Sequence, residues 1–262
     1  MTSEEIPLDE TGEEEEEEQQ MSLFDHLEEL RKRLIIIAVI IFAATIVSFV
    51  YIEDILDIIT MPAGDLQLIY ITPAEALMAQ IRLAFICGII ITLPLTIYQV
   101  LAFVLPALRN TEKKAIIPLI VSMILLFALG IVFAYSVVFP FALRFFLEFA
   151  MEDLTPYFTI SNYISFAVTF MVAFGVVFQT PVVFWFLGYL GIVSSFFLRK
   201  NRKFAILTMA VLSAFITPPD IFSQFLMIGP LAILYESGVL LVRLTERKRA
   251  KFAHLEEDVS RG

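Results

Sequence analysis

The chain has 262 residues, of which 59% are apolar and 18% are charged, and its mean hydropathy is +0.84. Soluble domains are about half apolar and a quarter charged, so this composition excludes an ordinary soluble domain and indicates a helical membrane protein with several spans. The net charge of −10 comes from residues 1–20, which hold ten acidic residues and no Lys or Arg. It therefore says nothing about the folded part, in which acidic and basic residues balance.

The acidic N-terminal segment, residues 1–21, is predicted to be disordered, because it includes a run of glutamates and has too few apolar side chains to offset the entropy of ordering. No cleavable signal peptide is expected, since such a signal begins with basic residues. Met21 would also serve as a start, which leaves open whether residues 1–20 are translated. We expect a membrane domain over residues 22–249 and a cytoplasmic tail over residues 250–262.

Six apolar runs follow, and each is predicted to cross the membrane as a helix. They cover residues 34–52, 83–105, 115–139, 163–187, 204–217 and 221–242. The fourth run stays apolar as far as Leu198, and a bend followed by a short cytosolic helix is predicted there from Gly188, Gly191, Ser194 and Ser195. Prolines within the runs predict kinked helices in a curved wall, at Pro94, Pro118, Pro181 and Pro230.

The basic residues predict the orientation of these spans. With six spans, 16 of the 18 Lys and Arg residues fall on one side, and only Arg82 and Arg144 fall on the other. By the positive-inside rule this side is the cytosol. We therefore expect a multi-pass protein of the cytoplasmic (inner) membrane with both termini cytoplasmic.

The fifth run is too short to span comfortably, since its 14 residues give about 21 Å of helix against a hydrocarbon thickness of about 30 Å. The turn that follows, Thr217-Pro218-Pro219-Asp220, cannot continue the helix. The fifth and sixth spans are therefore predicted to form a short hairpin. Such a hairpin thins the bilayer locally or is covered by partner helices.

Catalytic motifs are absent from the sequence. There is no phosphate-binding loop, no HExxH and no GxSxG, and the two histidines, His26 and His254, lie at cytoplasmic ends. The single cysteine, Cys87, allows neither a disulfide nor a thiolate metal cluster within one chain. We expect no enzyme activity, no metal and no cofactor. A small-solute transporter is a lesser alternative, because the chain shows no convincing internal repeat.

Two acidic positions near the cytosolic membrane surface could carry recognition. Glu28 with Lys32 and Glu29 with Arg33 are i,i+4 pairs that either support the helix, by about 0.2–0.5 kcal/mol each, or present a carboxylate to a guanidinium of a ligand. Glu112, in the first cytosolic loop, is open to the same two interpretations. Two such carboxylates on one face would form a fork for two adjacent arginines.

Polar side chains at membrane depth are costly and are functional candidates by default. Five are identified: Gln99, Gln179, Thr217, Gln224 and Glu236. The alternative for each is a hydrogen bond between helices, typically worth about 0.6 kcal/mol.

Several stretches resemble one family closely. They are residues 26–34 (HLEELRKRL), 98–103 (YQVLAF), 106–108 (PAL), 112–114 (EKK), 133–135 (FAY), 139–140 (FP), 173–178 (AFGVVF), 217–220 (TPPD) and 223–224 (SQ). In order, spacing and loop placement they are similar to TatC, the core receptor of the twin-arginine protein translocase. The resemblance covers about residues 22–249.

The resemblance implies a glove-shaped six-helix bundle that binds the twin-arginine signal peptides of folded precursor proteins at its cytosolic face. It implies that Glu29 and Glu112 engage the two arginines and that Phe103 and Pro106 shape the same surface, to which we also assign Leu27 and Arg31. The short fifth and sixth spans would dock the single-span partners TatA or TatB, with contacts at Thr217, Asp220 and Gln224. Self-association in a larger complex and transport driven by the proton-motive force are further implications; nucleic acid is not an expected partner.

Position 179 departs from the family, which often has a glutamate there. A glutamine cannot change charge, so a gating role for a protonatable group at this depth fails for this chain. We expect Gln179 to hydrogen-bond instead to a polar partner side chain or to a membrane-buried water.

Overall fold

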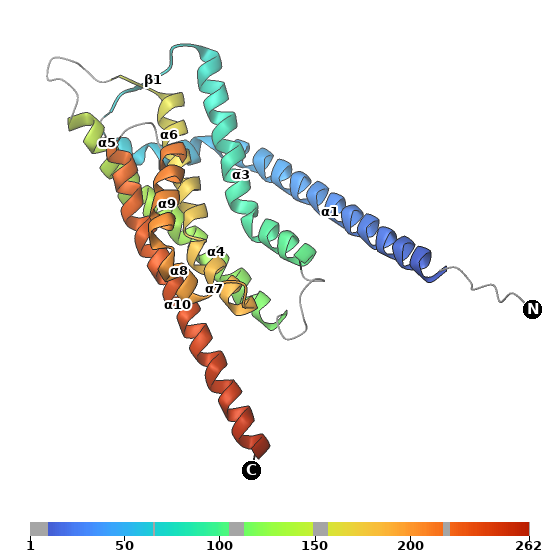
Figure 1. Cartoon of the computed structure of the whole chain (residues 1–262). Helices are drawn as coiled ribbons and strands as arrows, with labels where there is room; N and C mark the ends of the chain where they lie inside the picture. Colours follow the sequence, from blue (N-terminus) through green and yellow to red (C-terminus); the bar gives the residue numbers. More distant parts are fainter. Residues whose placement is uncertain (1–9, 65, 105–112, 149–156, 217–220, 262) are drawn as a thin grey trace, which may run out of the picture.

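The computed structural model describes residues 10–64, 66–104, 113–148, 157–216 and 221–261 (Figure 1). The elements in order are α1 (Glu10–Val50), α2 (Ile52–Thr60), the 3₁₀ turn η1 (Met61–Ala63), β1 (Leu68–Ile69), α3 (Pro73–Val104), the 3₁₀ turn η3 (Lys113–Ala115), α4 (Ile116–Phe133), the π-helical segment η4 (Ala134–Val138), α5 (Phe139–Glu148), β2 (Phe158–Thr159), α6 (Ile160–Val177), α7 (Thr180–Leu190), α8 (Ser195–Lys200), α9 (Arg202–Ile216) and α10 (Ile221–Arg261).

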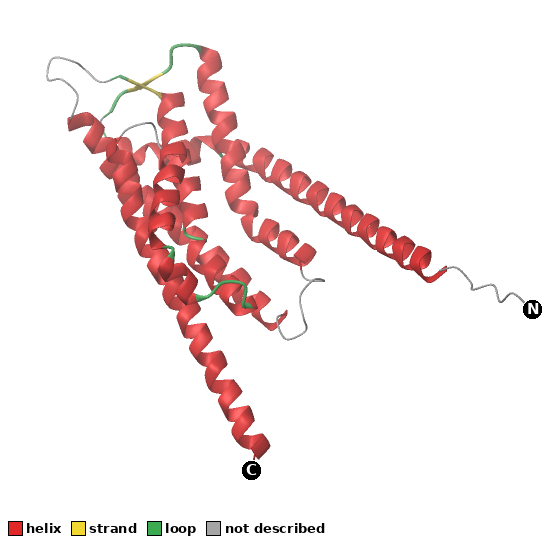
Figure 2. Ribbon diagram, in the orientation of Figure 1, coloured by secondary structure: helices red, strands yellow, loops and turns green. Residues whose placement is uncertain are grey.

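Five helical stretches of the described chain are long and apolar enough to cross a membrane: His26–Val50, Pro73–Phe103, Ile116–Glu148, Ile160–Leu190 and Met227–Arg249. They match all the predicted spans except the fifth, where α9 has only 15 residues. At 1.5 Å per residue α9 is about 22 Å long, so it is short, as predicted. The all-helical membrane architecture expected from the sequence is confirmed, with two short strands added (Figure 2).

Helix α6 lies at the centre of the bundle, in contact with α3 and α4. Its side chains Tyr163, Ile164, Phe170 and Phe174 are fully buried. Gly130 and Gly175 allow α4 and α6 to approach closely, because a Cβ atom on Gly130 would lie 2.6 Å from the Phe174 carbonyl oxygen. The core thus depends on glycine backbone contact as well as on aromatic packing.

Helix α1 diverges from the other helices and packs mainly along α3 (Figure 1). Within its apolar stretch only 6% of the residues are buried. The two helices meet at Gly88, where an added Cβ would lie 2.6 Å from Thr45 Oγ1 and 2.9 Å from the Thr45 backbone nitrogen. The absence of a side chain at Gly88 therefore sets how closely α1 approaches α3.

The predicted bend after the fourth span is confirmed. Helix α7 ends at Gly191, which has a φ of +79° that favours glycine, and Ser194 caps α8 by accepting a hydrogen bond from the Phe197 backbone N–H. The Glu246 carboxylate of α10 accepts hydrogen bonds from both the backbone N–H and the hydroxyl of Ser195. The α7–α8 corner is thereby fixed to α10.

The prolines contribute unequally to the predicted curvature. Pro94 and Pro230 lie inside α3 and α10, and α3 changes direction along its length in Figure 1. Pro181 lies in the first turn of α7, where the fourth span breaks. Pro118 lies in the first turn of α4 instead of its interior. Since the N–H groups there have no partner within the helix, Pro118 removes no helical hydrogen bond.

At the end of the molecule opposite the termini, β1 and β2 pair in parallel, with Leu68 opposite Phe158 (Figure 1). Two tyrosines also anchor α2 there. Tyr135 and Tyr163 donate to the carbonyl oxygens of Ile58 and Ile59, over 2.6 and 3.0 Å. Both carbonyls lie in the last turn of α2, and that of Ile58 also accepts from the Met61 backbone N–H. The tyrosine bonds therefore join the end of α2 to two other parts of the bundle.

The described parts of the two terminal segments continue the adjacent helices. Helix α1 begins at Glu10 and α10 continues to Arg261, so residues 10–21 and 250–261 are helical. Glutamate is a good helix former, and negative charge near a helix N-terminus interacts favourably with the helix dipole. Each segment also extends a helix that is already nucleated, which removes the main cost of forming one.

We expect Gly88→Ala to destabilise the protein. Overpacking costs about 1–3 kcal/mol, and the better helix propensity of Ala returns no more than about 1 kcal/mol. Thermal unfolding of the purified chain in detergent would measure the loss. Gly229→Ala is the matched control, because an added Cβ there meets nothing within 4 Å; equal stability of the two variants would contradict the close α1–α3 contact.

Candidate functional site

The part of α1 that the basic residues place towards the cytosol contacts the C-terminal end of α3 through His26 and Arg33. His26, Glu29 and Arg33 recur at the i, i+3, i+7 spacing of one helix face. The His26 ring stacks on Phe103 of α3, with ring centroids 4.2 Å apart and planes 16° from parallel. Arg33 Nη1 donates to Gln99 Oε1 over 3.0 Å. These contacts place Glu29 beside α3.

The Glu29 carboxylate is engaged through one oxygen. Arg33 donates to Glu29 Oε1 from Nε over 2.9 Å and from Nη2 over 2.5 Å, which confirms the predicted i,i+4 pair. No described residue donates a hydrogen bond to Oε2, and 35% of the Glu29 side chain is exposed. A carboxylate has about four acceptor positions, so Glu29 can accept a second guanidinium while it keeps the first.

Glu28 has different surroundings. The predicted Glu28–Lys32 ion pair is wrong: among the described residues the ion pairs are Glu29–Arg33 and Arg202–Glu236. Both side chains are exposed, where such a pair gains little. Glu28, Arg31 and Lys32 line a separate hollow of about 290 Å³ with Ile35 and Ile36. Leu27 and Arg31 are exposed.

The second predicted carboxylate, Glu112, lies outside the described residues, as does Pro106. Thr217 and Asp220, predicted to contact partner helices, also lie outside them. The fork of Glu29 and Glu112 therefore stays a prediction.

Among the described residues, a hydrogen bond and an ion pair join α9 to α10. Gln224 Nε2 donates to the Ala210 carbonyl oxygen over 3.0 Å. Glu236 accepts from Arg202 over 2.8 Å, and both side chains are about half exposed. Large apolar side chains of α9 remain exposed, including Phe204 at 70% and Leu207 at 61%. This face is apolar and lacks a covering helix among the described residues.

Gln179 lies between α6 and α7 and satisfies the end of α6. Its Nε2 donates to the carbonyl oxygens of Gly175 and of Met123 on α4, each over 3.2 Å. The Phe178 backbone N–H and the Thr180 hydroxyl serve two further carbonyls of this helix end. Gln179 Oε1 is buried and has no partner among the described residues. The amide nitrogen is thus used within the chain, whereas the amide oxygen is buried and unpaired among the described residues.

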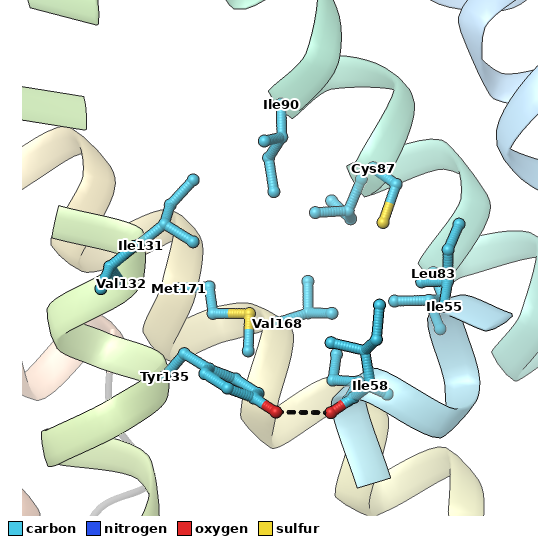
Figure 3. Close-up of a pocket in the computed structure, with 12 residues that line it drawn as sticks. Ile55, Ile58, Leu83, Cys87, Ile90, Ile131, Val132, Tyr135, Val168 and Met171 are labelled. Atoms are coloured by element: carbon cyan, nitrogen blue, oxygen red, sulfur yellow. Dashed lines mark hydrogen bonds between the residues drawn. The ribbon is translucent and has the colours of Figure 1, made fainter. Parts of the chain in front are cut away.

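An apolar cavity of about 300 Å³ lies among α2, α3, α4 and α6 (Figure 3). Ile58, Cys87, Ile90, Ile131 and Met171 contribute to its lining, and Figure 3 shows the Tyr135–Ile58 hydrogen bond at one edge. The cavity offers no charged group. In the part of the chain that the structure describes, no three His, Cys, Asp or Glu residues lie together as a metal ion requires.

Comparison with known proteins identifies the family. Residues 25–230 match the family model "Sec-independent protein translocase protein (TatC)". The chain belongs to the TatC family. The TatC protein of Carboxydothermus hydrogenoformans is 42% identical over 230 residues, which cover 87% of this chain and 95% of that protein. TatCy of Bacillus subtilis is 37% identical over 244 residues, which cover 92% and 96%.

A solved structure also matches. The crystal structure of the twin-arginine translocase receptor TatC superposes with a TM-score of 0.76 at 37% identity, over 84% of this chain and 99% of that one. The family consists of protein translocase components of the membrane, and the fold of this chain is the TatC fold.

Within this TatC-family chain, sequence reasoning found some residues of the α1–α3 contact and missed their relation. Glu29, Gln99 and Phe103 were identified separately, and Arg33 was assigned only a helix-supporting role. The structure joins Arg33 to Gln99, 66 positions away. His26 was not a candidate, and only its spacing from Glu29 and Arg33 could have indicated its place on the same face.

We expect Gln179→Leu to lower the free energy of unfolding by about 1 kcal/mol, because it removes two hydrogen bonds worth about 0.6 kcal/mol each in a membrane. Denaturation of the purified chain in detergent would measure this. Val176→Leu, at a position 60% exposed in the last turn of α6, is the control. Unchanged stability of the Gln179→Leu variant would show that its amide does not cap α6.

Proposed function

We propose that this chain is the receptor and scaffold subunit of a twin-arginine translocase. It binds the signal peptides of folded precursor proteins at the cytosolic membrane surface. The observation that carries the proposal is the partly exposed Glu29 carboxylate, in which one oxygen accepts from Arg33 and the other has no donor among the described residues. A guanidinium is the natural partner for such a carboxylate, since its planar fork donates two parallel bonds.

The two arginines of a signal would be shared between Glu29 and Glu112. Phe103, which stacks on His26, would form the apolar floor beside Glu29, and Pro106, Leu27 and Arg31 would border it. Each ion pair in a half-exposed site contributes about 1 kcal/mol. The apolar segment of the signal must supply the rest of the binding energy by burial in the membrane-facing surface.

The membrane topology that we propose follows from the distribution of the basic residues. Arg31, Lys32 and Arg33 at the start of the first span, and the basic residues of α8 and α10, would all face the cytosol, with six spans and both termini inside. Their anionic counterparts in the inner leaflet would hold this orientation. The membrane is the cytoplasmic (inner) membrane.

The exposed face of α9 and α10 is the proposed docking surface for single-span partners of the TatA or TatB kind. Helix α9, with 15 residues, is short for a bilayer. A partner helix would cover its exposed apolar side chains and reduce the cost of the hydrophobic mismatch. Gln224, Thr217 and Asp220 would supply polar contacts, with several copies in a larger assembly. Because the sequence has no nucleotide motif, assembly would be driven by the proton-motive force.

We expect Glu29→Gln and Glu112→Gln each to weaken binding of a synthetic twin-arginine signal peptide about fivefold, which corresponds to about 1 kcal/mol per ion pair. Fluorescence anisotropy with the purified chain in nanodiscs would measure the affinity. The affinity should also fall as salt is raised, since exposed charges are screened.

Glu28→Gln is the matched control, because it removes the same charge one position away on the helix, from a side chain that faces a separate hollow. Equal losses at all three positions would contradict the assigned fork. Flux of a small solute in proteoliposomes containing this chain alone would favour the transporter alternative.

A further inference from the structure

Arg33 is bound on two sides by groups from two helices. Two of its nitrogens, Nε and Nη2, donate to the same atom, Glu29 Oε1, while Nη1 donates to Gln99 Oε1 across the α1–α3 contact. The side chain is 23% exposed, so most of it is removed from solvent. Arg33 therefore links the carboxylate of α1 to the amide of α3.

This geometry requires an arginine. A guanidinium carries five N–H donors in a rigid plane, so it can reach two acceptors at fixed angles at once. A lysine ammonium has the same charge but is a point on a flexible stem, and it cannot fix the direction of the Glu29 carboxylate. The link thus supplies orientation as well as charge.

Arg33 occupies only one carboxylate oxygen of Glu29. An arginine that donated to both carboxylate oxygens in the bidentate manner would compete with the guanidinium of a ligand for the second oxygen. Here both bonds end on Oε1, and Oε2 receives no hydrogen bond from any residue that the structure describes. The arrangement holds the carboxylate in place and leaves its second oxygen for a ligand.

The helix contact next to the link supports the same arrangement. His26 precedes Glu29 by one turn, and Phe103 follows Gln99 by one turn; their rings stack. The two helices are therefore joined at two points, about two turns apart on α1 and one turn apart on α3, and Glu29 lies between these points on α1. Rotation of α1 that would turn Glu29 away from α3 must break both contacts.

We propose that Arg33 and Gln99 are positioning residues for signal-peptide recognition: they hold Glu29 on α1 so that its Oε2 receives an arginine of the signal. This inference rests on the proposed function, since it assigns the way in which Glu29 is oriented. On this proposal Glu28, which has the same charge and lacks such a link, would not substitute for Glu29.

The test is Arg33→Lys, which preserves the charge beside Glu29 and removes the fork. We expect it to weaken binding of the twin-arginine peptide about fivefold, and to reduce the preference for that peptide over a twin-lysine version. Gln99→Leu should weaken binding similarly, whereas Gln99→Glu, which keeps an acceptor for Arg33 Nη1, should restore it. Lys32→Arg, the reverse exchange at an exposed neighbour outside the link, should leave the affinity unchanged.

A double-mutant cycle separates positioning from a general structural effect. In a Glu29→Gln background, Arg33→Lys should cause no further loss, because Arg33 acts through Glu29. All variants are compared after size-exclusion chromatography and thermal unfolding of the full chain, so that misfolded protein is not counted.

Affinity of the Arg33→Lys variant equal to or above the original would overturn the proposal, as would a loss of the same size in the Glu29→Gln background. These outcomes differ from failure of the proposed function itself. In that case Glu29→Gln alone would leave peptide binding unchanged.

Discussion

The contact between α1 and α3 determines where the Glu29 carboxylate lies. Helix α1 is largely exposed along its apolar length and packs on the described chain mainly through α3. Gly88 permits the close approach near the middle of the two helices, and Arg33, Gln99 and the His26–Phe103 stack fix them near one end. Glu29 has a defined direction because the helix that carries it is fixed at both places.

A second constraint acts where the helices break. Backbone groups in an apolar environment need hydrogen-bond partners within the protein. At the α6–α7 break, Gln179 and Thr180 provide these partners. At the end of α2, Tyr135 and Tyr163 do so from other helices. Each break is stabilised by a polar side chain, which accounts for polar residues that would otherwise be costly there.

Under the proposed function, ionic recognition at this surface would be modest in energy and strong in specificity. The Glu29–Arg33 pair is only partly buried, so neither partner suffers the full desolvation cost of a buried charge. A ligand arginine would add to a carboxylate that is already oriented, which reduces the entropy lost on binding. Affinity would then come mainly from the apolar part of a signal, and discrimination from the direction of one carboxylate oxygen.

The sequence determined the features that depend on neighbouring residues. Hydropathy identified the long spans and the short α9, and the glycine and serine signals located the bend at Gly191 and the start of α8. The spacing of Glu29 and Arg33 predicted their ion pair. These features are local because hydropathy, turn chemistry and helix periodicity act over a few residues.

Only the tertiary structure decided which distant residues meet. Arg33 reaches Gln99 across 66 positions, Tyr163 reaches Ile59 across 104, and β1 pairs with β2. The tertiary structure also decided which of the two i,i+4 pairs forms. Glu29 and Arg33 pair next to α3, whereas Glu28 and Lys32, with the same spacing, are exposed and form no ion pair. The physical reason is that helix crossings, which no local pattern encodes, determine which side chains are desolvated and held in place.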